Sequence, residues 1–217
     1  MNETYYISRL NIIRKQSIIT NEKVEINNEN FVNFAAFIKS LYKKELISYP
    51  KFYKMDNISK LGFLGVEMLL KDTAFFDRYK KEDIGIVIMN SSSSLDTDLA
   101  YLNTIKDKSN YFPSPSVFVY TLPNIVIGEI CIRHQIKGEN AFFITDHFDP
   151  VKILESVTLL LEQDRVQACI CGWVEVLGDE FESLLFLVEK EKSIKEYYPS
   201  GGYSTFTVET LTKFYQN

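Results

Sequence analysis

The chain alternates between two patterns of apolar residues: short runs that are apolar almost throughout, and longer stretches in which apolar residues recur every three or four positions. A short apolar run is typical of a buried strand, and the spaced pattern is typical of an amphipathic helix. The runs predict strands at 84–89, just before 122, and at 141–145, 165–176 and 183–191. The spaced stretches predict helices at 28–45, 57–72, 95–106, 122–136 and 149–164.

Strands that alternate with helices predict a mostly parallel sheet with helices on both faces. The last two predicted strands lie too close together in the sequence for a helical crossover, so we expect them to pair antiparallel. A β-branched and aromatic stretch at 5–14 predicts an edge strand, and the tail predicts a turn followed by a short helix at 208–215. Because we find no repeat and no Pro/Gly-rich linker, we interpret residues 1–217 as one domain of the α/β class.

Composition and charge exclude several classes of function. A chain of 217 residues buries about 70% of the surface of its unfolded state, which is enough for a core without disulfides. The net charge of -5 and the pI near 5.2 leave no basic surface for nucleic acid. The apolar runs are far shorter than the roughly 18 residues of a membrane span, and the N-terminus has no secretory h-region. We therefore expect a cytoplasmic protein without membrane insertion or nucleic-acid binding.

Three cysteines, Cys131, Cys169 and Cys171, have neither C-x-x-C nor Cys/His metal spacing. Cys169 and Cys171 are two positions apart, so on a strand they point to the same face, and we interpret them as buried small residues. The sequence contains no cofactor motif either, and we expect neither a metal nor a cofactor.

Two polar stretches could carry chemistry, and each has a simpler interpretation. The serines at 91–94 follow an apolar strand without G-x-S-x-G or a P-loop lysine, so we interpret them as a turn rather than a nucleophile or phosphate site. Asp179, Glu180 and Glu182 are interpreted as a solvated loop rather than a metal site.

The stretch "GENAFFITDHFDP" (138–150) predicts a buried strand that runs into a helix, with Asp149 as N-cap and Pro150 at the first helical position. His147 lies at this strand-to-helix corner, where α/β enzymes often place a nucleophile. One hypothesis is that His147 is a general base or oxyanion donor oriented by Asp146 or Asp149. The other is that it caps the corner by hydrogen-bonding Asp146, Asp149 or a backbone group. Nearby carboxylates raise the pKa of a histidine and a helix N-terminus lowers it, so the sequence leaves both hypotheses open.

Several segments between residues 50 and 191 follow a recognisable order. In "YPKFYKMDNISKLGFLGVEMLL" a basic, aromatic turn leads into a helix, and "IGIVIMNSSSSLDTDLAYL" is a strand with a Ser-rich turn. In "SPSVFVYTLPNIVIGEICIRHQIKGENAFFIT" a Pro-Asn pair opens a helix that ends in a Gly-containing turn, and "ACICGWVEV" and "FLVEKE" follow. The match depends on Pro123, Asn124, Gly128, Gly138 and Asn140. This order resembles the N-terminal half of the β-ketoacyl synthases, which belong to the thiolase-like superfamily.

The resemblance implies a thiolase-like half: three layers, α-β-α, around a five-stranded mixed sheet. It also implies a cysteine at the strand end, where the dipole of the following helix favours the thiolate. In this sequence His147 stands at the position of that cysteine. The two catalytic histidines of the family belong to its C-terminal half, and this chain has only His134 and His147 in all. A histidine is a poor holder of a growing acyl chain, because an acyl-imidazole hydrolyses more readily than a thioester.

We therefore expect a β-ketoacyl synthase-like protein that does not condense. As a chain-length-factor-like partner it would pair with a ketosynthase subunit or with itself and act with an acyl carrier protein. The resemblance suggests fatty-acid, polyketide or aryl-polyene-type biosynthesis. One alternative is an enzyme that acts on acyl thioesters through His147, such as a hydrolase, and another is an acyl-binding module without chemistry. An isolated half would expose a face that the other half covers, and such a face needs a partner.

Overall fold

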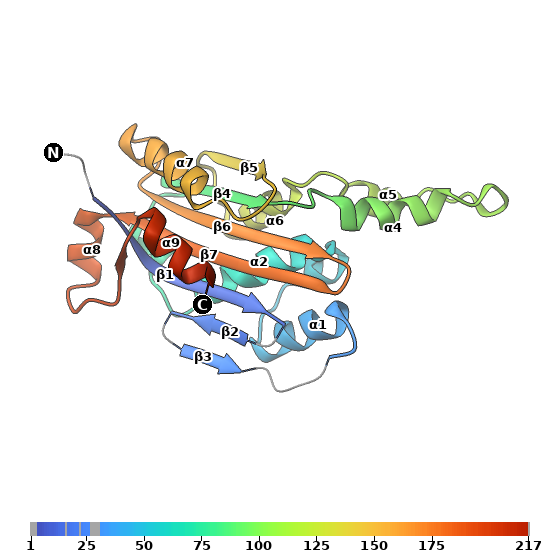
Figure 1. The fold of residues 1–217 in the computed structure, drawn as a ribbon, viewed down its shortest axis with the longest axis horizontal. Helices are drawn as coiled ribbons and strands as arrows, with labels where there is room; N and C mark the ends of the chain where they lie inside the picture. Colours follow the sequence, from blue (N-terminus) through green and yellow to red (C-terminus); the bar gives the residue numbers. More distant parts are fainter. Residues whose placement is uncertain (1–3, 16, 22, 27–30, 217) are drawn as a thin grey trace.

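The computed structural model describes residues 4–15, 17–21, 23–26 and 31–216, and its centre is one eight-stranded sheet (Figure 1). The strand order is β3-β2-β1-β7-β6-β4-β5, and β8 also pairs with β1. The strands are β1 Tyr5–Arg14, β2 Ser17–Thr20, β3 Lys23–Ile26, β4 Ile84–Asn90, β5 Asn140–Ile144, β6 Ala168–Leu177, β7 Glu180–Lys190 and β8 Ser204–Thr205. The helices are α1 Phe34–Lys44, α2 Asn57–Leu69, α3 Phe75–Arg78, α4 Leu95–Ile105, α5 Pro115–Phe118, α6 Ile125–His134, α7 Pro150–Glu162, α8 Glu191–Tyr197 and α9 Val208–Gln216.

The sheet is mixed, as the sequence predicts. β5, β4 and β6 are parallel, whereas β7 runs antiparallel to both of its neighbours, β6 and β1. The antiparallel pairing of the last two long strands is therefore confirmed. The expected number of five strands is wrong, because the hairpin β2–β3 and the two-residue β8 extend the sheet beyond β1. These three strands have only two to four residues each, too few to produce a clear pattern in the sequence.

The first strand is an interior strand, which corrects the prediction of an edge strand at 5–14. β7 pairs with one side of β1, and β2 and β8 pair with the other. Ile12 and Ile13 are buried on opposite faces of the sheet. A strand with both sides paired and both faces covered needs apolar residues throughout, which explains the β-branched stretch.

The strand at 140–144 lies at the edge of the sheet, which corrects the prediction of a buried strand. β5 pairs only with β4 among the described strands, and Ile144 is 57% exposed. Hydrophobicity alone does not distinguish an apolar edge strand from an interior one, because both read as the same short run.

No strand forms in the stretch just before residue 122, where the sequence predicts one. The segment begins the short helix α5, with Pro115 at its first position and the Ser114 hydroxyl accepting a hydrogen bond from the Val117 amide. This Ser-Pro pair is a strong helix start, and it outweighs the β-branched residues that follow.

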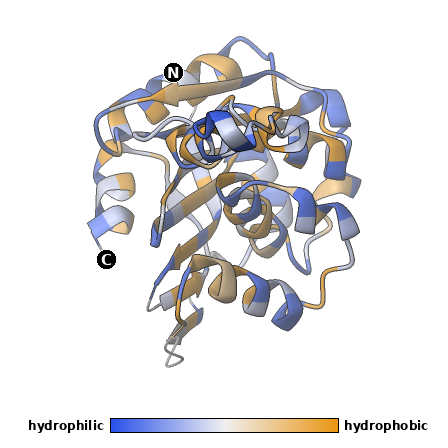
Figure 2. Ribbon diagram, turned by 90° about the vertical axis from the view of Figure 1, so that its right-hand side faces the viewer, coloured by the Kyte–Doolittle hydropathy of each residue, from blue (hydrophilic) through white to orange (hydrophobic). Residues whose placement is uncertain are grey.

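Helices cover both faces of the sheet, and each face has its own apolar cluster. On one face α1, α2 and α6 pack over a cluster that includes Phe63 and Leu64. On the other face α7 and α9 pack over a second cluster, which includes Phe186 of β7 and Ile153 of α7 (Figure 1). Figure 2 shows the mostly hydrophobic strands enclosed between helices of mixed character. The predicted helix in the tail is confirmed, and Phe214 of α9 packs 5.9 Å from Phe186 between ring centroids. No helix in the described ranges is long and apolar enough to cross a membrane.

Candidate functional site

The predicted strand-to-helix corner forms between β5 and α7. Gly138 sets the entry to β5, because a Cβ there would lie 2.3 Å from the carbonyl oxygen of Ile84. Asp149 is the N-cap of α7, and its carboxylate accepts a hydrogen bond of 2.9 Å from the Lys152 amide. The Thr145 hydroxyl donates to the backbone carbonyl of His147 over 2.8 Å and holds the turn. The predicted cap and helix start are confirmed, and the Asp149 carboxylate is already occupied by the helix backbone.

His147 points into solvent at this corner. Its side chain is exposed, as is that of Asp146, and no described residue forms a hydrogen bond with the imidazole ring. Three pockets formed by described residues, of about 190, 300 and 530 Å³, are lined by other segments and do not include His147. His147, Asp146 and Asp149 are therefore neighbours along the chain, but neither carboxylate forms a hydrogen bond that orients the imidazole ring. A catalytic role for these residues stays a prediction.

Phe148 occupies the interior of the corner. Its side chain is 3% exposed and stacks on Tyr215 of α9, with 4.6 Å between ring centroids. It also packs nearly perpendicular to the ring of Trp173, with 6.4 Å between ring centroids. The residue that points inward where β5 meets α7 is thus an aromatic ring, and the space beneath the corner is filled by apolar side chains.

A cluster of charged side chains lies at the same carboxyl edge of the sheet, and no pattern in the sequence indicates it. Glu175 of β6 and Glu182 of β7 face each other in the strand register. Arg14 of β1 forms an ion pair with Glu182, with 2.8 Å between Nε and Oε2, and donates from Nη2 to the backbone carbonyl of Tyr215. Burial and the neighbouring Glu182 raise the pKa of the Tyr215 hydroxyl. The cluster attaches α9 to the sheet.

The Ser-rich stretch is a turn, as predicted, and Glu175 holds it. One oxygen of Glu175 accepts hydrogen bonds from the Ser91 amide, the Ser91 hydroxyl and the Ser92 amide. The acidic loop is more structured than predicted. The Asp179 carboxylate accepts a hydrogen bond of 2.8 Å from the amide of Phe34 at the start of α1, and Glu182 pairs with Arg14. Among the described residues, no group of His, Cys, Asp and Glu is placed to hold a metal ion.

The remaining titratable candidates lie away from the corner. Cys169 and Cys171 are completely buried on the same face of β6, as predicted, and burial raises the pKa of both thiols. Cys131 is half-buried, and burial raises its pKa as well. His134 stacks on Phe76 at 4.9 Å and lies 3.2 Å from a carboxylate oxygen of Glu67. None of these groups lines any of the three pockets formed by described residues.

An arm of residues 91–122 projects from the body beyond the carboxyl end of β4 (Figure 1). It contains α4 and α5, and many of its apolar side chains are exposed. Leu95, Leu99 and Leu102 lie on one face of α4 at 42–49% exposure, and Phe118 of α5 is 58% exposed. Ile144 of β5 pairs with Asn90, the residue just before the arm, and the outer edge of β5 has no partner among the described strands. We call the arm and the β5 edge together the docking face. Exposed apolar surface of this kind typically marks a protein interaction site.

Replacing His147 with alanine is expected to leave the free energy of unfolding unchanged within about 0.5 kcal/mol, because the ring is exposed and makes no hydrogen bond with a described residue. Urea unfolding of the two proteins measures this difference. If His147 is a catalytic base for acyl thioesters, His147→Ala lowers thioester hydrolysis by a factor of roughly 100 or more. We expect no such loss, and a large loss in a folded variant would establish the hydrolase hypothesis.

Comparisons with known proteins identify the fold. No family model and no curated protein matches the sequence. Among solved structures, the chain is similar to "The ishigamide ketosynthase/chain length factor", with a TM-score of 0.62 and 16% identity over 88% of this chain and 63% of that one. It is also similar to a type II PKS acyl-carrier protein in complex with its ketosynthase, AntDE:AntF, with a TM-score of 0.60 and 14% identity over 91% of this chain and 66% of that one.

A third similar structure is the ketosynthase ApeO in complex with its chain length factor ApeC from Xenorhabdus doucetiae. Its TM-score is 0.56, with 12% identity over 86% of this chain and 79% of that one. At these identities the likeness establishes the fold, and the fold resemblance predicted from the sequence is confirmed. The chain spans less than two thirds of the first two matched chains.

Proposed function

We propose that this protein is a non-condensing, chain-length-factor-like partner of a ketosynthase in fatty-acid, polyketide or aryl-polyene-type biosynthesis. The observation that carries the proposal is the exposed His147 at the corner between β5 and α7. The resemblance places the nucleophilic cysteine at this position. A ketosynthase needs a thiolate there, because a thioester holds the acyl chain through the condensation step.

No other thiol in the chain is suited to replace that cysteine. Cys131 is half-buried on α6, away from the corner, and burial raises its pKa. Cys169 and Cys171 are buried within the sheet, and burial raises the pKa of both well above the usual range for cysteine. A thiol with a raised pKa is mostly protonated near neutral pH and is a weak nucleophile. The fold of a ketosynthase without its nucleophile supports a role in assembly rather than in condensation.

The docking face supports the proposal that a partner with the same fold binds this protein. An unpaired strand edge is a template for another strand, and the neighbouring arm adds large apolar side chains to the same region. The matched structures include a ketosynthase with its chain length factor and an acyl-carrier protein with its ketosynthase. For this chain we infer the same classes of partner: a ketosynthase subunit or a second copy of the chain at the docking face, and an acyl carrier protein that visits the complex.

The two alternative functions have less support. An acyl-binding module needs an apolar cavity, but Phe148, Trp173 and Tyr215 fill the space beneath the corner. A thioester hydrolase needs an oriented base, and His147 has no orienting contact among the described residues. The single sheet joins strands from both ends of the chain and supports residues 1–217 as one domain. The free buried thiols are in keeping with the cytoplasmic location that we infer.

The test is the mass of the protein in solution, alone and with the full-length ketosynthase encoded nearest to it. Sedimentation at micromolar concentration is expected to give a dimer of the chain or a one-to-one complex with the ketosynthase. The complex is further expected to make acyl products of a different length from those of the ketosynthase alone. A monomer under both conditions contradicts the proposed partnership. Condensation by this chain without a ketosynthase contradicts the non-condensing role.

A further inference from the structure

The outer side of β1 has a notch in the middle of its length. At one end β8 pairs with Tyr6 and Ile7, and further along β2 pairs with residues 11–13. Between these pairings, residues 8 and 9 have no strand partner on that side within the described part of the chain, and the backbone of Leu10 is hydrogen-bonded to Asn21 in the turn after β2. The pairing with β7 on the other side also shifts register between Ile7 and Arg9. The notch is therefore a gap in the strand pairing on the outer side of β1.

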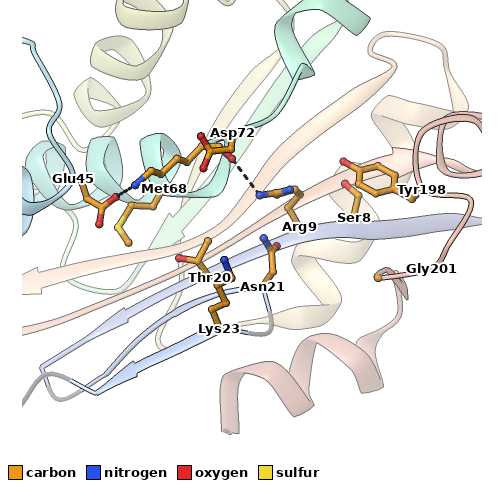
Figure 3. Close-up of a pocket in the computed structure, with 12 residues that line it drawn as sticks. Ser8, Arg9, Thr20, Asn21, Lys23, Glu45, Met68, Asp72, Tyr198 and Gly201 are labelled. Atoms are coloured by element: carbon orange, nitrogen blue, oxygen red, sulfur yellow. Dashed lines mark hydrogen bonds and ion pairs between the residues drawn. The ribbon is translucent and has the colours of Figure 1, made fainter.

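Two pockets meet at the notch. The larger has a volume of about 530 Å³ and the smaller about 300 Å³, and the two share Ser8, Arg9, Asn21 and Gly202 in their walls. The walls of the larger pocket come from β1, from the turn after β2, from the ends of α1 and α2, and from the loop before β8 (Figure 3). A pocket of this volume is within the range that holds small organic ligands, roughly 300–1,000 Å³.

Arg9 differs from the other arginines of the chain. The chain has five arginines, and Arg14, Arg78, Arg133 and Arg165 each pair with a glutamate. Arg9 has no ion pair with a described residue. Among the described residues its side chain makes one hydrogen bond, of 3.3 Å from Nη2 to the carbonyl oxygen of Lys71, and no described group accepts from its buried Nε. A guanidinium has five N–H donors and is best satisfied by a bidentate anion, so Arg9 has unused binding capacity.

Among the described residues that line the larger pocket, the charges sum to one excess positive charge. Arg9, Lys23 and Lys71 contribute three positive charges, and Glu45 and Asp72 contribute two negative ones. Lys71 lies 2.9 Å from a carboxylate oxygen of Glu45, so these two charges compensate each other. An excess of +1 within a protein of net charge -5 fits a ligand with a single negative charge. A phosphate with two negative charges would exceed this single positive charge and would be repelled by the carboxylates of Glu45 and Asp72.

The other groups of the larger pocket are neutral and polar. The walls contain the hydroxyls of Ser8, Thr20 and Tyr198 and the side-chain amide of Asn21, whereas Met68 is an apolar exception. The Ser8 hydroxyl donates to the Leu187 carbonyl, and the oxygens of Thr20, Tyr198 and Asn21 accept hydrogen bonds from Asn11, Arg78 and the Leu10 amide. No described residue accepts a hydrogen bond from the Thr20 hydroxyl or the Asn21 side-chain nitrogen, so these two groups are the donors for a ligand hydroxyl. In Figure 3 Ser8 and Tyr198 lie side by side near Arg9, and Thr20, Asn21 and Lys23 lie opposite Glu45 and Asp72. Hydroxyl and amide groups recognise ligand hydroxyls. We propose that the notch binds a small hydroxylated monocarboxylate, whose carboxylate pairs with the guanidinium of Arg9.

The proposal is independent of the partner role, because the notch lies on β1 and the docking face lies at β5, at different positions in the sheet. The experiment is an NMR titration of the full chain with lactate and with gluconate at constant ionic strength. Saturable shifts are expected at the amides of Ser8, Asn21, Gly201 and Gly202. Inorganic phosphate, as the comparison anion, is expected to bind at least tenfold more weakly.

The Arg9→Gln variant is expected to weaken carboxylate binding at least tenfold, because a charged bidentate contact becomes a neutral one. The matched control is Arg165→Gln, which removes an exposed arginine that pairs with Glu139 and leaves the notch unchanged. If Arg9→Gln does not fold, Arg9→Lys replaces it. This variant is expected to lose less carboxylate affinity, because lysine keeps the positive charge but cannot donate two parallel hydrogen bonds to the carboxylate. Unsaturable shifts, equal affinity in Arg9→Gln or Arg9→Lys, or tighter binding of phosphate each overturn the proposal.

Discussion

Phe118→Asp is expected to weaken association with the partner by a factor of roughly 30 to 1,000, which corresponds to about 2–4 kcal/mol. Phe118 is 58% exposed on the arm and lies near Tyr101, with 5.3 Å between ring centroids. A large aromatic residue at the centre of an interface usually carries much of the binding energy, and an aspartate there would bury an unpaired charge. Sedimentation equilibrium across a concentration series measures the dissociation constant.

The folded state of this variant is expected to be intact, because the ring is mostly in solvent before association. Ile144→Asp on β5 tests the other part of the docking face and is expected to weaken association in the same direction. Leu46→Asp is the matched control. Leu46 is 89% exposed, lies outside the docking face, and has the positive φ of 55° that aspartate tolerates better than leucine. Loss of association in Leu46→Asp, or none in Phe118→Asp and Ile144→Asp, would place the interface elsewhere.

Phe148→Ala is expected to lower the free energy of unfolding by about 3–5 kcal/mol. The ring is buried between Trp173 and Tyr215, so its removal deletes apolar contacts and leaves a cavity beneath the corner. For a chain of this length the melting temperature should fall by roughly 10 °C. Urea unfolding measures the difference, and the slope with denaturant shows whether unfolding remains two-state.

His147→Ala is the control for this measurement, since it changes the adjacent residue at the same corner. The two positions differ in burial, and we expect a large effect at 148 and almost none at 147. Similar effects at both positions would contradict the inward orientation of Phe148. The variant with the cavity also tests the acyl-binding alternative. A fatty acyl chain that binds Phe148→Ala but not the natural protein would show that the ring occupies the space needed for such a ligand.

Much of the fold was predictable because its signals are local. The stripe of apolar residues at 57–72 produces α2, and the apolar runs produce β4, β6 and β7 close to their predicted bounds. Asp149 and Pro150 start α7 as predicted, because a side-chain cap and a fixed φ act within one helical turn. The short spacing between β6 and β7 likewise permits only an antiparallel hairpin.

The candidate site was less predictable, because its contacts join distant parts of the chain. Arg14, Glu175 and Glu182 come together only because β1, β7 and β6 are neighbours in the sheet. Nothing in the sequence near any of the three residues indicates the other two. The notch around Arg9 arises in the same way, from two short strands that pair with separate parts of β1.

The sequence by itself determined the α/β class, the corner at 145–150 and the histidine that stands there. Only the tertiary structure decided that β1 is interior, that β5 is an edge, and that Phe148 rather than His147 faces the core. The physical reason is that strand order depends on pairing between segments far apart in the sequence. A shift of one residue at a strand end reverses which side chain points inward. Apolar periodicity determines neither the strand order nor this direction.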